Sequence, residues 1–182
     1  MSTRTKDPLL VTGKVLALIL QAASALVGVF FILMIPLVIL KSLGITTGFF
    51  DGPDAPIVFQ YPLPGLALLV ALALFLAACF LFFGKLRALI DTVGKGDPFT
   101  PENAQRLKMM AWLALAMQLL VMAVAWLRNY TAALTMGIAD SGLGIGFGRD
   151  DIVGVMMVIV LFILARVFRH GAAMRADLEG TV

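Results

Sequence analysis

Few residues of this chain have side chains that could do chemistry. His170 is the only histidine and Cys79 the only cysteine. A metal site needs several histidine, cysteine or carboxylate ligands, and none stands beside His170 in the sequence. Cys79 lies within an apolar run, which is typical of a small packing residue. We therefore predict no catalytic centre, no metal site and no bound cofactor.

A glycine-rich run at 142–148 contains the letter pattern of a dinucleotide-binding loop. Such a loop requires a preceding strand, a helix whose N-terminus faces the pyrophosphate, and an acidic residue farther along the chain. The distribution of basic residues places this run on the outer side of the membrane, so we interpret it as a structural loop.

The composition indicates the elements that must position these residues. Hydrophobic residues make up 61% of the chain and charged residues 14%, against roughly 45–50% and roughly 25% in soluble domains. A helix that crosses a bilayer needs about 20 apolar residues. Four segments approach this requirement, and we predict a single all-α membrane domain, a four-helix bundle whose helices span the bilayer: 15–40, 65–83, 109–127 and 152–168.

The basic residues predict the orientation. Eleven of the fourteen Lys and Arg residues flank the N-terminus, the middle connection or the C-terminal end. Basic residues mark the cytoplasmic side of a membrane protein. Both termini and the middle connection are therefore expected in the cytoplasm. Because the basic residues are not gathered in one segment, we predict no direct binding of nucleic acid.

The middle connection is expected to be a helical hairpin. Apolar residues at 86, 89, 90 and 93 have the spacing of an amphipathic helix, so the second span should continue two to three turns beyond the membrane. Gly94 and Gly96 should end it. Thr100 suits an N-cap and Pro101 the first helical position, which predicts a new helix that leads into the third span.

The outer connections have a different character. Residues 57–61 are strand-like, and residues 142–148 alternate glycine with apolar residues. These two stretches could pair into a small antiparallel β element outside the membrane. Asp150 or Asp151 is expected to cap the fourth span.

Three polar residues lie inside the predicted spans: Gln21, Ser24 and Gln118. They could line a pathway, or they could form hydrogen bonds between packed helices. A proton or cation pathway usually requires a carboxylate within the membrane, and the spans contain none. We therefore favour interhelical hydrogen bonds.

The turn of the cytoplasmic hairpin is the best candidate for a functional surface. It combines polar side chains with an aromatic residue, and the predicted partner-binding residues are Asp97, Phe99, Glu102, Asn103 and Arg106. Phe99 could anchor the turn to the membrane surface instead of contacting a protein.

The same turn resembles the signature of a bacterial membrane family catalogued as domain of unknown function 2975. The resembling residues run from Gly96 to Asn103 and continue with Arg106-Leu107. Residues 167–171 and 177–182 are similar to a second signature of that family. The resemblance covers essentially the whole chain, although Arg166 stands where an acidic or neutral residue is expected. It implies a four-span protein of the bacterial cytoplasmic membrane, without assigned activity, whose gene often neighbours that of a small helix-turn-helix regulator.

We accordingly expect a regulatory or interaction protein that holds a soluble cytoplasmic partner, such as a small helix-turn-helix regulator, on its hairpin. The tail residues Arg169, Asp177 and Glu179 are expected to pack beside the hairpin. The alternative function is a small transporter or passive channel formed by a homo-oligomer. An enzyme that acts on lipid is disfavoured, because one histidine has no partner with which to build a site.

Overall fold

The computed structural model describes residues 8–45, 56–96, 98–136 and 149–179. This part of the chain is helical and contains no strand, so the prediction of an all-α fold is confirmed. The elements are α1 (Pro8–Ser42), α2 (Ile57–Gln60), α3 (Pro62–Gly94), α4 (Pro101–Met136) and α5 (Arg149–Glu179).

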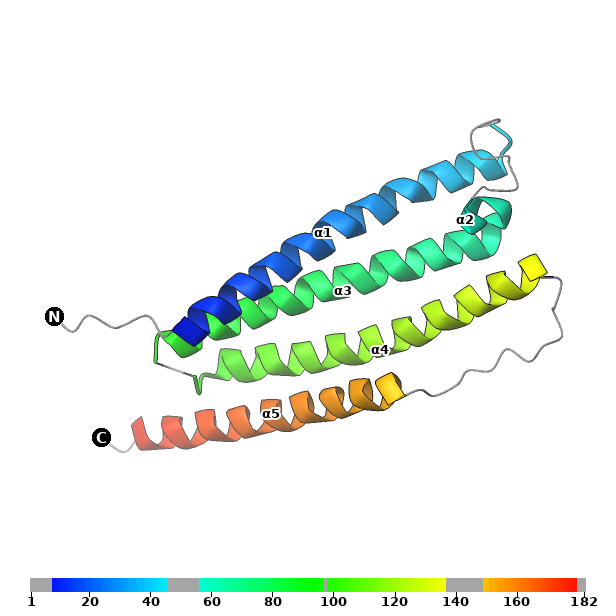
Figure 1. Ribbon diagram of the computed structural model, residues 1–182. Coiled ribbons are helices and arrows are strands. Elements are labelled where there is room, and N and C mark those ends of the chain that lie inside the picture. The colour runs from blue at the N-terminus through cyan, green and yellow to red at the C-terminus, as the bar shows by residue number, and fades with distance from the viewer. Residues whose placement is uncertain (1–7, 46–55, 97, 137–148, 180–182) are drawn as a thin grey trace.

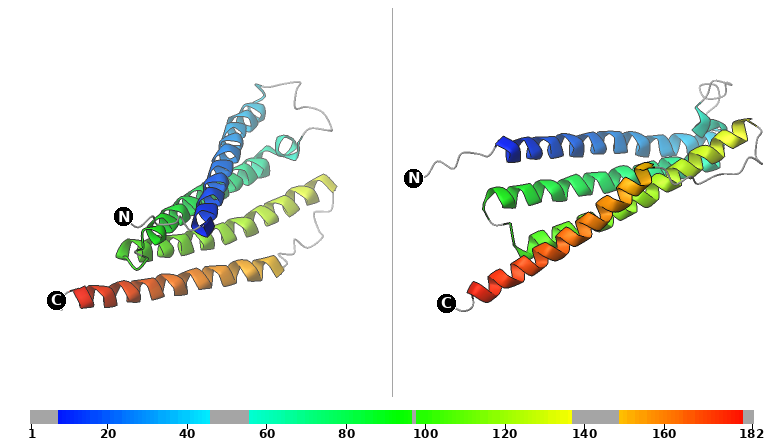
Figure 2. Two further views of the ribbon diagram at one scale, coloured as in Figure 1. Left: turned by 60° about the vertical axis from the view of Figure 1, so that its left-hand side comes forward. Right: turned by 60° about the horizontal axis from the view of Figure 1, so that its bottom comes forward.

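The four long helices lie side by side in the order of the sequence (Figure 1). Helix α1 packs along α3, α3 along α4, and α4 along α5. No other two long helices of the described part pack along each other, so they form an open layer and not a closed bundle (Figure 2). The start of α1, the α3–α4 turn and the end of α5 share one end of the layer, which we call the hairpin end. We call the opposite end the loop end.

Each long helix is long and apolar enough to cross a membrane. Only 17% of the most apolar window of each helix is buried inside the protein. Such exposed apolar surface is stable only in a bilayer, so the chain is a multi-pass membrane protein. The helices extend beyond the predicted spans. The 36 residues of α4 measure about 54 Å at 1.5 Å per residue, against a hydrocarbon core of about 30 Å.

Two buried clusters hold the layer together. Leu107 and Ala111 of α4 pack against Leu161 and Ala165 of α5. Nearer the loop end, Val38 of α1, Phe59 of α2 and Leu69 of α3 form the second cluster. Because each cluster joins neighbouring helices only, each interface must be stable without a common central core.

Within the strand-like segment 57–61, residues 57–60 form the helix α2 and Tyr61 precedes α3, so the predicted β element is wrong at this position. Phe59 is 4% exposed and packs into the second cluster, and its amide donates a hydrogen bond to the Pro56 carbonyl. Burial of this aromatic ring therefore outweighs the local strand preference. The corner at α3 is tight, because a Cβ atom on Gly65 would lie 2.5 Å from the Val58 carbonyl oxygen. The proposed pairing partner, 142–148, lies outside the described residues.

The helical form of the predicted hairpin is confirmed, since α3 and α4 pack along each other on either side of a short turn. Helix α3 continues beyond the predicted span and ends at Gly94. Gly96 then has φ 86°, a left-handed conformation that glycine adopts without steric cost. Helix α4 begins at Pro101, and the Thr100 hydroxyl accepts a hydrogen bond from the Asn103 amide at 3.3 Å. Thr100 is thus the N-cap that the sequence predicts.

Gln118 joins two helices as predicted. Its side-chain amide nitrogen, Nε2, donates a hydrogen bond to the Asp151 carboxylate at 3.2 Å. The side chain lies directly over Gly154, where a Cβ atom would come within 2.7 Å of its Cδ carbon. Asp151 is therefore occupied by this bond. Asp150 and Asp151 both stand inside α5, which begins at Arg149, so the prediction that one of them is the N-cap of this helix is wrong.

The other two polar residues of the spans behave differently. Ser24 donates to the Leu20 carbonyl within its own helix, so the prediction of an interhelical hydrogen bond is wrong for this residue. Serine in a helix commonly bonds to the preceding turn in this way. Gln21 lies against α3, where a Cβ atom on Gly84 would be 3.0 Å from its Nε2. Its side-chain oxygen, Oε1, is buried and has no hydrogen-bond partner among the described residues.

Candidate functional site at the hairpin end

The α3–α4 turn is organised around Asn103, which is completely buried. Its side-chain oxygen accepts hydrogen bonds from the Thr92 hydroxyl at 2.9 Å and from the Arg106 guanidinium at 2.8 Å. Its side-chain nitrogen donates to the Pro98 carbonyl at 3.0 Å. One amide therefore joins the last turns of α3, the turn itself and the first turns of α4.

Burial decides what Asn103 can do. A side chain with no exposed surface does not contact a second protein in this conformation. Arg106 is half-buried, and its guanidinium also lies 3.5 Å from the Ala88 carbonyl oxygen of α3. These two predicted site residues therefore hold the shape of the turn, and they present little surface themselves.

Phe99 connects the turn to α5. Its ring lies 5.1 Å from the ring of Phe168, centroid to centroid, with a tilt of 44°. A Cβ atom on Gly171 would lie 2.7 Å from Phe99 Cδ1, so only glycine leaves room for the ring at this point. Phe99 is nevertheless 43% exposed. It is thus docked on α5 by one face, while the other face remains accessible.

The remaining predicted residues are placed as follows. Glu102 is exposed in the first turn of α4, and Asp97 lies outside the described residues. In the tail, Arg169 and Asp177 are exposed on α5. The tail contact with Phe99 is made by Phe168 and Gly171, which were not among the predicted site residues. A glycine one turn after an aromatic residue, inside the second signature segment, was the available signal.

Residues 50–182 match the model of a family described as protein of unknown function (DUF2975). The chain belongs to this family. The match contains both signature segments and excludes α1, so it is shorter than the whole-chain resemblance suggested. In the structure the two segments meet, because Phe99 of the first packs on Phe168 and Gly171 of the second. The comparisons with curated proteins and with solved structures give no match.

A salt bridge ties α1 to the hairpin end of this DUF2975 protein. Lys14 Nζ lies 2.6 Å from an Asp91 carboxylate oxygen. This hydrogen bond from Lys14 is the main cause that lowers the pKa of Asp91, which lies two turns beyond the predicted span 65–83. Both side chains are largely exposed, and such pairs contribute little to stability. The bridge is therefore a weak addition to the packing of α1 along α3.

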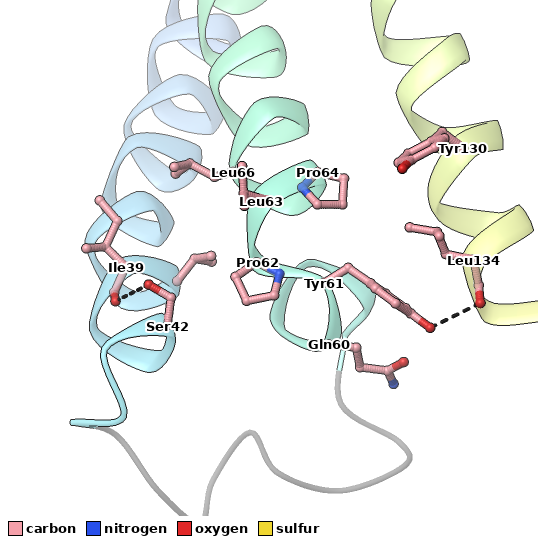
Figure 3. A pocket seen from close by; sticks show the side chains of 11 residues that line it. Ile39, Ser42, Gln60, Tyr61, Pro62, Leu63, Pro64, Leu66, Tyr130 and Leu134 are labelled. Atoms are coloured by element: carbon pink, nitrogen blue, oxygen red, sulfur yellow. Dashed lines mark hydrogen bonds between the residues drawn. The ribbon is translucent and has the colours of Figure 1, made fainter.

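A cavity of about 440 Å³ lies at the loop end, between α1, the start of α3 and the end of α4 (Figure 3). The Tyr61 hydroxyl donates to the Leu134 carbonyl at 3.1 Å, and the Ser42 hydroxyl donates to the Ile39 carbonyl at 2.7 Å. Both hydroxyls are therefore engaged within the protein. The other lining residues include leucines and prolines, and none of them is charged. The lining of the cavity is thus mainly apolar, with Gln60 and Tyr130 as further polar residues.

The residue types that bind metal ions do not cluster in the described part of the chain. In the described ranges, no three His, Cys, Asp or Glu residues come close enough to share a metal ion. Cys79 of α3 faces α4, where its sulfur lies 3.4 Å from the sulfur of Met117. It therefore has the packing environment that the sequence predicts for it.

Proposed function

We propose that this protein is a membrane-resident interaction protein that holds a soluble partner on the hairpin end. The observation that carries the proposal is the pre-ordered turn, in which a buried Asn103 fixes the backbone while Phe99 and Glu102 stay accessible. A surface that is already rigid loses little conformational entropy on binding. An exposed aromatic ring next to a charged side chain is also typical of a protein-contact surface.

The distribution of charge supports a cytoplasmic position for this surface. Basic residues of all four long helices gather at the hairpin end: Lys14, Lys85, Arg87, Lys95, Arg106, Lys108, Arg166, Arg169 and Arg175. Lys41 and Arg128 lie toward the loop end. By the positive-inside rule, the hairpin and both termini face the cytoplasm of a bacterial cell.

The partner that the family resemblance suggests is a small helix-turn-helix regulator. Helix α5 supplies a route for a signal, because it carries the Phe99 contact near one end and reaches toward the loop end at the other. A shift of α5 against α4 would move Phe168 and change how much of Phe99 is presented. The bilayer or the outer loops would thereby control the partner.

Photo-crosslinking in native membranes tests the proposal. A photo-reactive residue at position 102 stands on the exposed first turn of α4. The control probe is at Leu63, which is 85% exposed at the loop end. We expect position 102 to capture a small soluble DNA-binding protein that position 63 does not capture. Only lipid adducts or self-crosslinks at both positions would refute the proposal.

The captured protein must then bind directly. Purified wild-type protein in nanodiscs is compared with Phe99→Ala and with the control Leu63→Ala, which removes an exposed apolar side chain from the other end. An exposed aromatic contact residue typically contributes about 1–2 kcal/mol to binding, so Phe99→Ala should weaken the affinity for the partner roughly five- to thirtyfold. Leu63→Ala should leave the affinity unchanged. Equal affinities for all three proteins would place the partner elsewhere.

The second candidate function is a small transporter or passive channel formed by an oligomer. It is favoured by the open layer, since one layer of helices can enclose a path only together with further copies. Solute flux in proteoliposomes, measured together with the mass of the reconstituted particle, separates the two candidates. Flux that requires an oligomer would favour the channel, and a monomer without flux would exclude it.

A further inference from the structure

A groove of about 780 Å³ runs between α4 and α5 at the hairpin end. Its floor is made of small residues, which include Ala104, Ala172 and Ala173. Small side chains at a helix interface leave space that lipid or ligand can enter. The groove belongs to neither the buried Asn103 network nor the loop-end cavity, since it shares no lining residue with them.

Two basic side chains line this groove from opposite helices. Lys108 of α4 and Arg169 of α5 are both exposed. The helices are antiparallel, and Ala111 and Ala165 pack in one cluster roughly one turn deeper. Lys108 and Arg169 therefore lie at about the same depth. None of the residues that line the groove is acidic, so the two basic side chains favour an anion between them.

The groove changes character toward the middle of the membrane. Met109 and Trp112 line it on the membrane side of Lys108. The Trp112 ring packs edge-on against Phe162, with ring centroids 5.5 Å apart, so it is held in place. Tryptophan rings concentrate at the headgroup level of a bilayer. The groove thus combines a cationic mouth with an apolar wall beneath it, in a helix layer that is open to lipid.

We propose that this groove binds an anionic phospholipid of the surrounding leaflet. The lipid phosphate lies between the Lys108 ammonium and the Arg169 guanidinium, and Gln105 lines the same mouth as a further polar group. An acyl chain follows Met109 and Trp112 toward the bilayer centre. Basic pockets between membrane helices hold the headgroups of anionic lipids in this way. The site goes beyond the proposed function, because it requires no protein partner.

Trp112 provides the test, because it lines the groove. The other tryptophan, Trp126, stacks on Tyr130 farther along α4 and is replaced in Trp126→Phe to leave a single reporter. This protein is reconstituted in phosphatidylcholine vesicles that contain a minor fraction of acyl-brominated phosphatidylglycerol. A parallel sample contains acyl-brominated phosphatidylcholine. Bromine quenches tryptophan fluorescence only at short range, so quenching reports which lipid occupies the groove.

We expect the quenching of Trp112 to show that the groove binds brominated phosphatidylglycerol roughly tenfold more strongly than brominated phosphatidylcholine. The reason is that the two basic residues attract the net negative charge of the phosphatidylglycerol headgroup. The excess should disappear in Lys108→Gln/Arg169→Gln. It should persist in the control Lys85→Gln/Arg87→Gln, which removes equal charge from α3 at the same end. Unchanged helicity and thermal unfolding in both double variants show that the fold is intact.

Three outcomes would overturn the proposal. The first is equal quenching by the two brominated lipids. The second is a phosphatidylglycerol preference that survives Lys108→Gln/Arg169→Gln. The third is loss of the preference on addition of inorganic phosphate, which would make the groove a site for soluble anions. None of these outcomes bears on partner capture at position 102, so the two proposals fail separately.

Discussion

Replacement of Asn103 by alanine should loosen the hairpin turn without unfolding the helices. The substitution removes the acceptor for Thr92 and Arg106 and the donor to the Pro98 carbonyl. These bonds connect α3 to α4 at the turn where the chain reverses direction between the two helices. The turn would then keep the Thr100 cap, the Phe99 contact and the approach of Arg106 to the Ala88 carbonyl.

The magnitude follows from what each former partner can do afterwards. The Thr92 hydroxyl keeps an acceptor, because the Leu89 carbonyl oxygen lies 2.7 Å away. Arg106 is half-buried and can turn to water or to the Ala88 carbonyl. The Pro98 carbonyl loses its donor. With about 0.5–1.5 kcal/mol for each neutral bond and somewhat more for the charged one, local opening should become easier by about 2–3 kcal/mol.

Amide hydrogen exchange measures this opening. Peptides that cover 98–107 should exchange roughly thirty- to hundredfold faster in Asn103→Ala. Thr92→Val is the matched control, since Asn103 keeps its bonds to Arg106 and Pro98, and it should accelerate exchange no more than about fivefold. Unchanged exchange of 98–107 in Asn103→Ala would refute the reasoning. Equal acceleration along all helices would show that Asn103 stabilises the whole fold and not the turn.

Three glycine positions give further predictions. Gly171→Ala should push the Phe99 ring off α5, seen as faster exchange of 98–107 and, if the proposed function holds, weaker partner binding. Gly154→Ala should displace Gln118 and lower the stability of the α4–α5 interface by about 1–3 kcal/mol, measured by chemical unfolding in micelles. Gly65→Ala should open the α2–α3 corner by a similar amount, measured as increased exchange of 56–66, with no change at the hairpin end. The absence of these local effects would show that the glycine contacts are not needed.

The sequence predicted the helices because their signals are local. Apolar length indicates a span, and 65–83 lies within α3 as 109–127 lies within α4. The hairpin was predictable for the same reason, since Thr100 caps α4 and Gly96 adopts a positive φ through interactions within a few residues. The prediction failed where tertiary packing overrode the local pattern. Residues 57–61 look like a strand, but burial of Phe59 against Val38 of α1 and Leu69 of α3 accompanies a helix at 57–60.

The candidate site depended on contacts that no local pattern reveals. Asparagine is usually exposed at a protein surface, and only the pairing of α3 with α4 buries Asn103. Phe99 meets Phe168 because α5 returns to the hairpin end, nearly seventy residues later in the chain. Residue type and spacing predicted the turn as a candidate functional surface. They did not show which of its side chains form the interior of the turn and which remain on its surface.

The sequence by itself therefore determined that this is a four-span helical membrane protein with a capped hairpin, because apolar length, basic flanks and caps act over one or two turns. Only the tertiary structure decided that the helices form an open layer, that Gln118 lies over Gly154, and that Lys108 faces the same groove as Arg169. These features depend on which face each helix turns toward its neighbour. In a chain whose helices are apolar on nearly every face, the periodicity that would indicate such a choice is weak, and close packing at small residues makes it instead.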